Sequence, residues 1–247
     1  MKNIYFLLLL IVISSLNLSC SDENDNTFEE KKITGLNSIN YNSDGSIYSK
    51  NTYKYYYNNS NFINKIHIKR VYESKPERNH EYIINRVFID NKVVVEEFDY
   101  IQKRTNSSNI LKIDFSYTND LITSETSTFD NDTERIINYF YNDKDYLESK
   151  QDIDESSKYS YFYNNQNLLE KEIYNENFES LFKYENVLNP FYKGSPLAHR
   201  KISFIQEEMR FFIDLEIQVE KNKTGYPLNI KKYRDGNLWS EVNYIYE

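Results

Sequence analysis

One unit recurs along most of this chain: alternating residues ending in an aromatic side chain, a short turn of polar residues, and then an aliphatic residue. It reads Tyr41-NSDGS-Ile47 at its first occurrence. From Tyr117 the aromatic residue returns after 24, 22 and 21 residues, at Tyr141, Tyr163 and Tyr184. That spacing is the length of a two-stranded hairpin with its connection, so the repeat predicts successive antiparallel hairpins.

The segments beside the turns alternate with a period of two, which is typical of strands with one buried face. Leu111, Ile113, Phe115 and Tyr117 alternate with polar residues. Other aromatic residues sit on both faces of their strands, as Tyr55 and Tyr56 do. Either both faces of the sheet are covered, or one exposes an aromatic band. We expect an all-β fold over residues 33–247, an antiparallel meander of roughly nine hairpins forming one long curled sheet or open barrel.

Composition supports this architecture. The chain has 24 Tyr and 15 Phe, which favour the pleated surface of a strand. It has only five Gly and four Pro. Asn and Asp must therefore supply most of the turns, because both tolerate left-handed backbone conformations and form local hydrogen bonds.

Two stretches interrupt the pattern, and such interruptions often carry function. Residues 73–81 form a charged segment whose Pro76 blocks sheet pairing. Residues 189–200 contain Pro190, Gly194 and Pro196 and lead into Ile202–Met209, for which a short helix and an irregular strand are both open.

The N-terminus predicts export. Lys2, an apolar run over residues 4–13 and small residues before Cys20 have the layout of a signal peptide. The run covers roughly 15 Å, about half of a bilayer core, too short for a transmembrane helix. Leu18-Ser19-Cys20 resembles a bacterial lipobox, although Asn17 stands where that motif usually has Leu. We expect a signal peptide over residues 1–19 and lipidation of Cys20, the only cysteine, which excludes an internal disulfide.

The segment after Cys20 is acidic and almost free of apolar residues, so residues 20–32 are expected to be a flexible tether. Its Ser21-Asp22-Glu23-Asn24-Asp25-Asn26 run resembles the surface-export signal of lipoproteins of the Bacteroidota. This resemblance implies the outer face of the outer membrane. The periplasm-facing leaflet is the alternative.

Two resemblances cover the repeats. Tyr161-Phe162-Tyr163-Asn164-Asn165-Gln166-Asn167-Leu168 resembles the YD repeats of Rhs-type proteins but lacks their Gly-Arg pair. The chain as a whole is similar to a group of uncharacterised Tyr-rich lipoproteins of the Bacteroidota. The segments that carry this likeness are 184–191 (YENVLNPF) and Tyr244-Ile245-Tyr246. The group implies β-hairpins and a lipid anchor, but no activity.

No catalytic, cofactor-binding or metal-binding residue is predicted. His67, His80 and His199 lack metal-ligand spacing, with His67 on a solvated strand face and the other two in the irregular stretches. The carboxylates at 96–99, 130–134 and 152–155 are expected in solvated turns, and the second group lacks the Gly and Glu of a calcium loop. Exposed aromatic residues, Trp239 among them, could instead stack on sugars or form a protein interface.

These observations lead to an expected function. We expect a membrane-anchored, non-enzymatic binding or structural module that takes a glycan or protein ligand, with no cofactor. The formal net charge of −8 argues against nucleic acid as a partner. Two alternatives stay open: a periplasm-facing lipid carrier or toxin-immunity-type lipoprotein, and a glycoside hydrolase, which would need two carboxylates about 5–9.5 Å apart.

Overall fold

The structure is a computed structural model that describes residues 32–104, 108–165, 169–176, 178–185, 204–209 and 215–247. Residues 1–30 and 31–247 form separate units, and the description below concerns the second. Within these ranges no helix has the length and apolar character needed to cross a membrane.

The described chain is almost entirely β-strand, as the alternation predicts. The strands are β1 (Ile33–Tyr41), β2 (Ile47–Tyr57), β3 (Ile63–Tyr72), β4 (His80–Ile89), β5 (Lys92–Gln102), β6 (Ile110–Thr118), β7 (Leu121–Phe129), β8 (Glu134–Tyr141), β9 (Leu147–Asp152), β10 (Lys158–Tyr163), β11 (Leu169–Tyr174), β12 (Phe178–Glu185), β13 (Phe204–Met209), β14 (Leu215–Lys221), β15 (Pro227–Arg234) and β16 (Asn237–Tyr246). A single 3₁₀ turn, η1 (Pro76–Arg78), interrupts them in the described chain.

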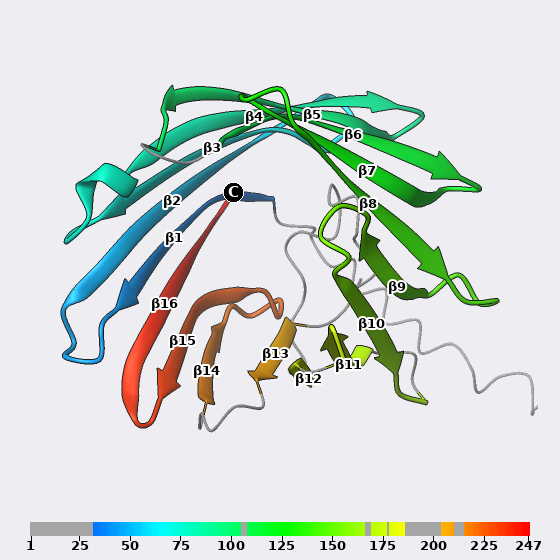
Figure 1. The fold of residues 1–247 in the computed structure, drawn as a ribbon. Coiled ribbons are helices and arrows are strands. Elements are labelled where there is room, and N and C mark those ends of the chain that lie inside the picture. Colours follow the sequence, from blue (N-terminus) through cyan, green and yellow to red (C-terminus); the bar gives the residue numbers. More distant parts are fainter. Residues whose placement is uncertain (1–31, 105–107, 166–168, 177, 186–203, 210–214) are drawn as a thin grey trace, which may run out of the picture. The chain divides into compact units, whose positions relative to one another are not determined.

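All sixteen strands belong to one antiparallel sheet (Figure 1). Strands β1 to β13 follow one another as a meander, and β14 to β16 form a second run that joins it where β16 pairs with β1. The edges are β13 and β14, so the sheet is not closed. The predicted all-β meander is confirmed. Its β1–β16 ladder, which joins the two ends of the described chain, is a feature that the repeat did not predict.

Two kinds of turn connect the hairpins, and both use the residues that the composition singled out. Turns such as Asn58–Phe62 and Asn142–Tyr146 are followed by a bulge in the next strand, and their fourth residue has a positive φ: 62° at Asn61 and 62° at Asp145. Two-residue turns such as Asp90-Asn91 have a positive φ at both positions, as the twist of a tight hairpin requires. Asn and Asp therefore do most of the work that glycine does in other hairpin proteins.

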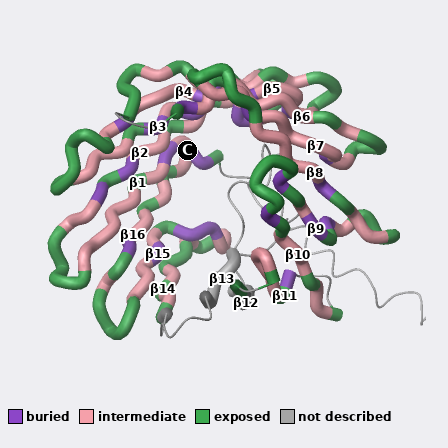
Figure 2. The backbone as a smooth tube through the Cα atoms, viewed as in Figure 1, coloured by how far each residue is buried: buried purple, intermediate pink, exposed green. Residues whose placement is uncertain are grey.

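Buried residues recur on many strands of the sheet (Figure 2), and the apolar ones pack together on one of its faces. Ile63, Ile66, Ile68 and Ile84 are buried together against Tyr53, Tyr55, Tyr57, Tyr82 and Phe98. A second cluster joins Ile122, Tyr139 and Leu147. The opposite face exposes aromatic side chains, with Tyr56 45% and Phe140 46% exposed. Of the two possibilities left open by the sequence, the aromatic band on one face is the one that the structure shows.

A tyrosine hydroxyl completes the strand pairing at four places along one end of the sheet. Tyr57 donates to the carbonyl oxygen of Ile33 at 2.7 Å, and Tyr117 donates to that of Val93 at 2.7 Å. The same bond joins Tyr163 to Leu147 at 2.9 Å and Tyr246 to Pro227 at 2.8 Å. In each case the tyrosine lies three residues after the last residue of its own strand that pairs with the neighbouring strand. The carbonyl group belongs to the residue two positions before the partner of that last paired residue. We call these four bonds the tyrosine clasps.

The irregular stretches differ in part from expectation. The charged segment ends at Asn79, because η1 follows Pro76 and His80 already begins β4. Residues 204–209 form β13, so the helix alternative is wrong for them. Residues 189–200 lie outside the described chain.

Candidate functional site

The ladder between β9 and β10 is short, and a cavity opens beside it. Only three residue pairs join these strands, the last being Ser149 with Ser160. Beyond that pair the strands separate around a cavity of about 690 Å³. We call it the tyrosine cavity; its principal lining residues are Asn142, Lys144, Tyr146, Glu148, Tyr161 and Tyr163.

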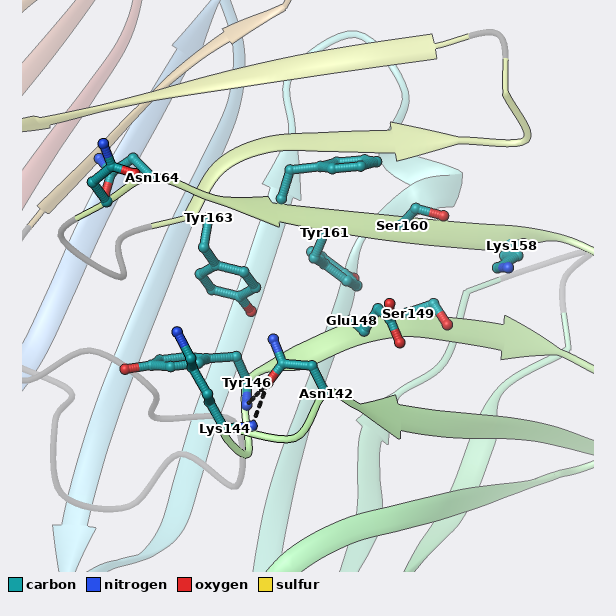
Figure 3. Close-up of a pocket in the computed structure, with 12 residues that line it drawn as sticks. Asn142, Lys144, Tyr146, Glu148, Ser149, Lys158, Ser160, Tyr161, Tyr163 and Asn164 are labelled. Carbon is teal, nitrogen blue, oxygen red and sulfur yellow. Dashed lines mark hydrogen bonds between the residues drawn. The ribbon is translucent and has the colours of Figure 1, made fainter.

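Two tyrosines of β10 and one from the preceding turn point into this space (Figure 3). The clasp from Tyr163 to Leu147 spans the opening, and the ring of Tyr163 lies 5.2 Å from that of Tyr146. Asn142 fixes the turn, because its Oδ1 accepts the backbone N–H groups of Lys144 and Tyr146, each at 3.0 Å. The aromatic walls are therefore held in place without a ligand.

Polar groups surround the aromatic walls. Lys144, Glu148 and Lys158 are exposed at the margin, and Ser149 and Ser160 contribute hydroxyls. Burial raises the pKa of Tyr161, and the charge of Glu172 and a hydrogen bond to it raise the pKa further, so the phenol is neutral at physiological pH. The cavity offers aromatic faces, donors and acceptors side by side, which is the usual make-up of a small-molecule site.

The histidines singled out in the sequence occupy different environments. His67 lies on β3, where its Nε2 is 2.8 Å from Oε1 of Glu81, in agreement with the predicted strand face. His80 does not lie in a loop as expected: it is the first residue of β4 and only 4% exposed. His199 and Cys20 lie outside the described residues.

The three carboxylate groups hold local structure, and the first does not lie in a solvated turn as expected, because residues 96–99 belong to β5 and Glu96 is only 8% exposed. Glu96 accepts a hydrogen bond from Nε of Arg86 at 2.7 Å. Asp130 binds the backbone N–H and the side chain of Asn109, and Asp152 pairs with Arg135. In the part of the chain that the structure describes, no group of three or more His, Cys, Asp or Glu residues is placed to hold a metal ion.

The cavity itself was not predicted. Tyr159, Tyr161 and Tyr163 alternate along β10, but a row of tyrosines does not show where a neighbouring ladder stops. No signal in the sequence locates the cavity, because the point at which the β9–β10 ladder stops depends on the register of the two strands.

Comparison with known proteins gives a relation of fold. No protein-family model matches the chain, and neither does any curated protein. Among solved structures, a porin-like protein from Bacteroides uniformis is similar with a TM-score of 0.57 and 15% identity, over 87% of this chain and 98% of that one. The chain thus has an all-β fold that is also found in a Bacteroides protein.

Proposed function

We propose that this protein is an exported, lipid-anchored binding module without enzymatic activity, and that its tyrosine cavity binds a sugar unit of a glycan. The observation that carries the proposal is the set of three tyrosines, Tyr146, Tyr161 and Tyr163, around a cavity with a polar margin. A sugar ring has an apolar C–H face and a rim of hydroxyls. Such a ligand matches aromatic walls bordered by donors and acceptors.

The lining favours binding over hydrolysis. Of the described residues that border the cavity, Glu148 carries the one carboxylate. Glycoside hydrolysis by the usual route needs two carboxyl groups on either side of the scissile bond. A glycosidase would therefore need a second carboxylate from outside this lining.

The N-terminus and the fold support an outer-membrane location. The signal peptide, Cys20 and the acidic run predict a lipid anchor at the cell surface, and a protein of similar fold is described as porin-like. Capture of a glycan at the cell surface is consistent with both.

Binding of the purified protein to xylohexaose, maltohexaose and chitohexaose tests the cavity by isothermal titration calorimetry. We expect at least one of these neutral oligosaccharides to bind, and Tyr146→Ala to weaken its affinity about tenfold, since truncation of an aromatic anchor costs about 1.4 kcal/mol or more. Tyr56→Ala, which removes an exposed ring from β2, is the matched control and should leave binding unchanged. Absence of binding, or an equal loss in both variants, would contradict the proposal. Release of shorter sugars would replace it with a hydrolase.

The anchor is tested separately. Cys20→Ala should move the protein from the membrane fraction to the soluble fraction, because the acyl chains that hold it are lost. Protease added to whole cells should digest the wild-type protein if it is surface-exposed. Retention of Cys20→Ala in the membrane would exclude lipidation at Cys20, and protection from protease would favour the periplasm-facing alternative.

A further inference from the structure

A second cavity lies beside another short ladder. Strands β5 and β6 are joined by only three residue pairs, from Val95–Asp114 to Glu97–Lys112. Beyond Glu97 the rest of β5 borders a cavity of about 210 Å³. We call it the arginine cavity; its principal lining residues are His80, Tyr82, Phe98, Tyr100, Arg104 and Asn109.

The walls and the mouth of this cavity differ in character. Tyr82 packs between Phe98 and Tyr100, with ring centroids 5.9 and 5.3 Å away. His80 stacks on Tyr82 at 5.8 Å and is buried. Arg104 is exposed at the mouth. The cavity therefore has aromatic and imidazole walls beneath a single solvent-accessible guanidinium.

Arg70 and Arg104, the two arginines near the His80 ring, have no carboxylate partner among the described residues. Arg70 lies opposite His80 in the β3–β4 ladder and donates to the hydroxyl of Tyr53 at 3.3 Å, while its Nε is buried without a hydrogen-bond partner. Arg104 makes its one side-chain hydrogen bond within the described chain to His80.

The nearby carboxylates are already occupied. Asp130 accepts hydrogen bonds from Asn109 and from Lys103 at 3.1 Å. Glu96 is paired with Arg86 at 2.7 Å. The surplus positive charge at the cavity therefore comes from Arg70 and Arg104.

Nδ1 of His80 cannot form a hydrogen bond with both Arg78 and Arg104 at the same time. Nδ1 of His80 lies 2.9 Å from the carbonyl oxygen of Arg78 and 3.2 Å from Nε of Arg104. Burial lowers the pKa of His80, and the charges of Arg104 and Arg70 lower it further, so the ring is neutral at pH 7. If Nδ1 of His80 carries the proton, it can donate to the carbonyl oxygen of Arg78, but the Nε–H group of Arg104 then faces a second donor. If Nδ1 carries no proton, it can accept from Arg104, but the carbonyl oxygen of Arg78 then has no donor from this ring.

We propose that the arginine cavity binds a ring-bearing carboxylate, whose anion takes the guanidinium of Arg104 and whose ring rests on the aromatic walls. A carboxylate would supply an acceptor that the described residues do not give Arg104, and it would leave Nδ1–H of His80 to the carbonyl of Arg78. Paired N–H···O bonds to a carboxylate are among the strongest that a guanidinium makes. A cavity of about 210 Å³ has the volume that about seven water molecules occupy in the liquid. This volume suits one ring rather than a chain of sugars. This site is separate from the tyrosine cavity, and the proposal stands whether or not that cavity binds a glycan.

The test is a titration of the purified protein with benzoate and glucuronate, each compared with its neutral counterpart, benzyl alcohol and glucose. We expect one or both acids to bind in calorimetry and to shift the ring signal of His80 in the NMR spectrum. The chain has only three histidines, and the loss of one signal in His80→Gln identifies it. The acid that binds more tightly distinguishes an aromatic from a sugar acid. Equal binding of the neutral compounds, or binding that leaves the His80 signal unmoved, would overturn the proposal.

Charge-matched variants separate the site from general electrostatics. Arg104→Gln should weaken binding at least tenfold. The affinity of Arg104→Lys should lie between those of the wild type and Arg104→Gln, since lysine keeps the charge and loses the planar guanidinium. Arg234→Gln removes the same charge from an exposed side chain outside the lining and should leave binding unchanged. Both arginines are exposed, so both variants should fold, as circular dichroism can confirm. Equal weakening in Arg104→Gln and Arg234→Gln would show attraction by net charge and refute the site.

Discussion

The tyrosine clasps make a quantitative prediction for Tyr117→Phe, which removes one hydroxyl and nothing else. That hydroxyl donates to the carbonyl oxygen of Val93 at 2.7 Å, beyond the end of the three-pair β5–β6 ladder, and Val93 is only 4% exposed. A hydrogen bond of this kind contributes about 0.5–1.5 kcal/mol, and a carbonyl left buried without its donor costs about 1–3 kcal/mol. Because the site is partly open to water, we expect a loss of about 1–2 kcal/mol in the free energy of unfolding.

Urea unfolding of the purified protein, followed by circular dichroism, measures this loss, and thermal unfolding should show it as about 2–4 °C per kcal/mol for a unit of this size. Tyr56→Phe is the control, because Tyr56 is 45% exposed and its hydroxyl makes no hydrogen bond within the described residues. It should change stability by less than about 0.5 kcal/mol. If Tyr117→Phe is as stable as Tyr56→Phe, the clasps do not contribute to stability.

Three further predictions concern ionisation and backbone conformation. Burial raises the pKa to about 12 at three tyrosines, Tyr57, Tyr100 and Tyr117. The fold keeps these phenols neutral, so stability should fall as the pH rises from 10 towards 12, by about 1.4 kcal/mol per tyrosine at pH 11; a melting temperature that stays constant from pH 9 to 11 would contradict this. The backbone N–H of Asn109, followed by its side chain and Lys103, lowers the pKa of Asp130 to about 2. Its stabilising contribution should therefore be present above pH 4 and disappear as the pH falls towards 2, and Asp130→Asn should remove that part of the acid dependence of the melting temperature. Gly45 has φ +81° and open space around its Cβ position, so Gly45→Ala should cost about 1 kcal/mol through the backbone alone; an unchanged urea midpoint would show that the turn adapts.

The local parts of this fold could be predicted from the sequence because their causes are local. Alternation predicted β6, whose Phe115 and Tyr117 pack against the core, although Leu111 lies at a bulge and is 39% exposed. The composition predicted turns made of Asn and Asp, such as those at Asp90-Asn91 and Asn119-Asp120. The expectation of Asn and Asp in left-handed conformations is met at both turns. Each of these features depends on a few adjacent residues.

The candidate sites could not be predicted because they depend on where ladders stop. Nothing near Ser160 or Glu97 in the sequence indicates that pairing ends there, since that depends on the register of two strands together. His80 was placed in a loop because Pro76 breaks the pattern only four residues earlier, whereas η1 completes the reversal within three residues and allows β4 to begin. Arg104 gave no signal, because its role comes from the side chains around it.

Because β1 pairs with β16, the sheet can be completed only after the ribosome has made both strands. Ile33 pairs with Tyr246, and the backbone N–H of Glu247 donates to the carbonyl oxygen of Lys32. Strand β1 therefore cannot pair with β16, one of its two neighbours, until β16 has been synthesised. A chain that ends before Asn237 lacks β16, and it leaves the β14–β15 hairpin without a partner as well as exposing an edge of β1. Loss of these eleven residues would thus remove one strand, detach two others and leave an open edge that favours aggregation. A truncation that removes β16 is therefore expected to cost more of the sheet than the strand itself.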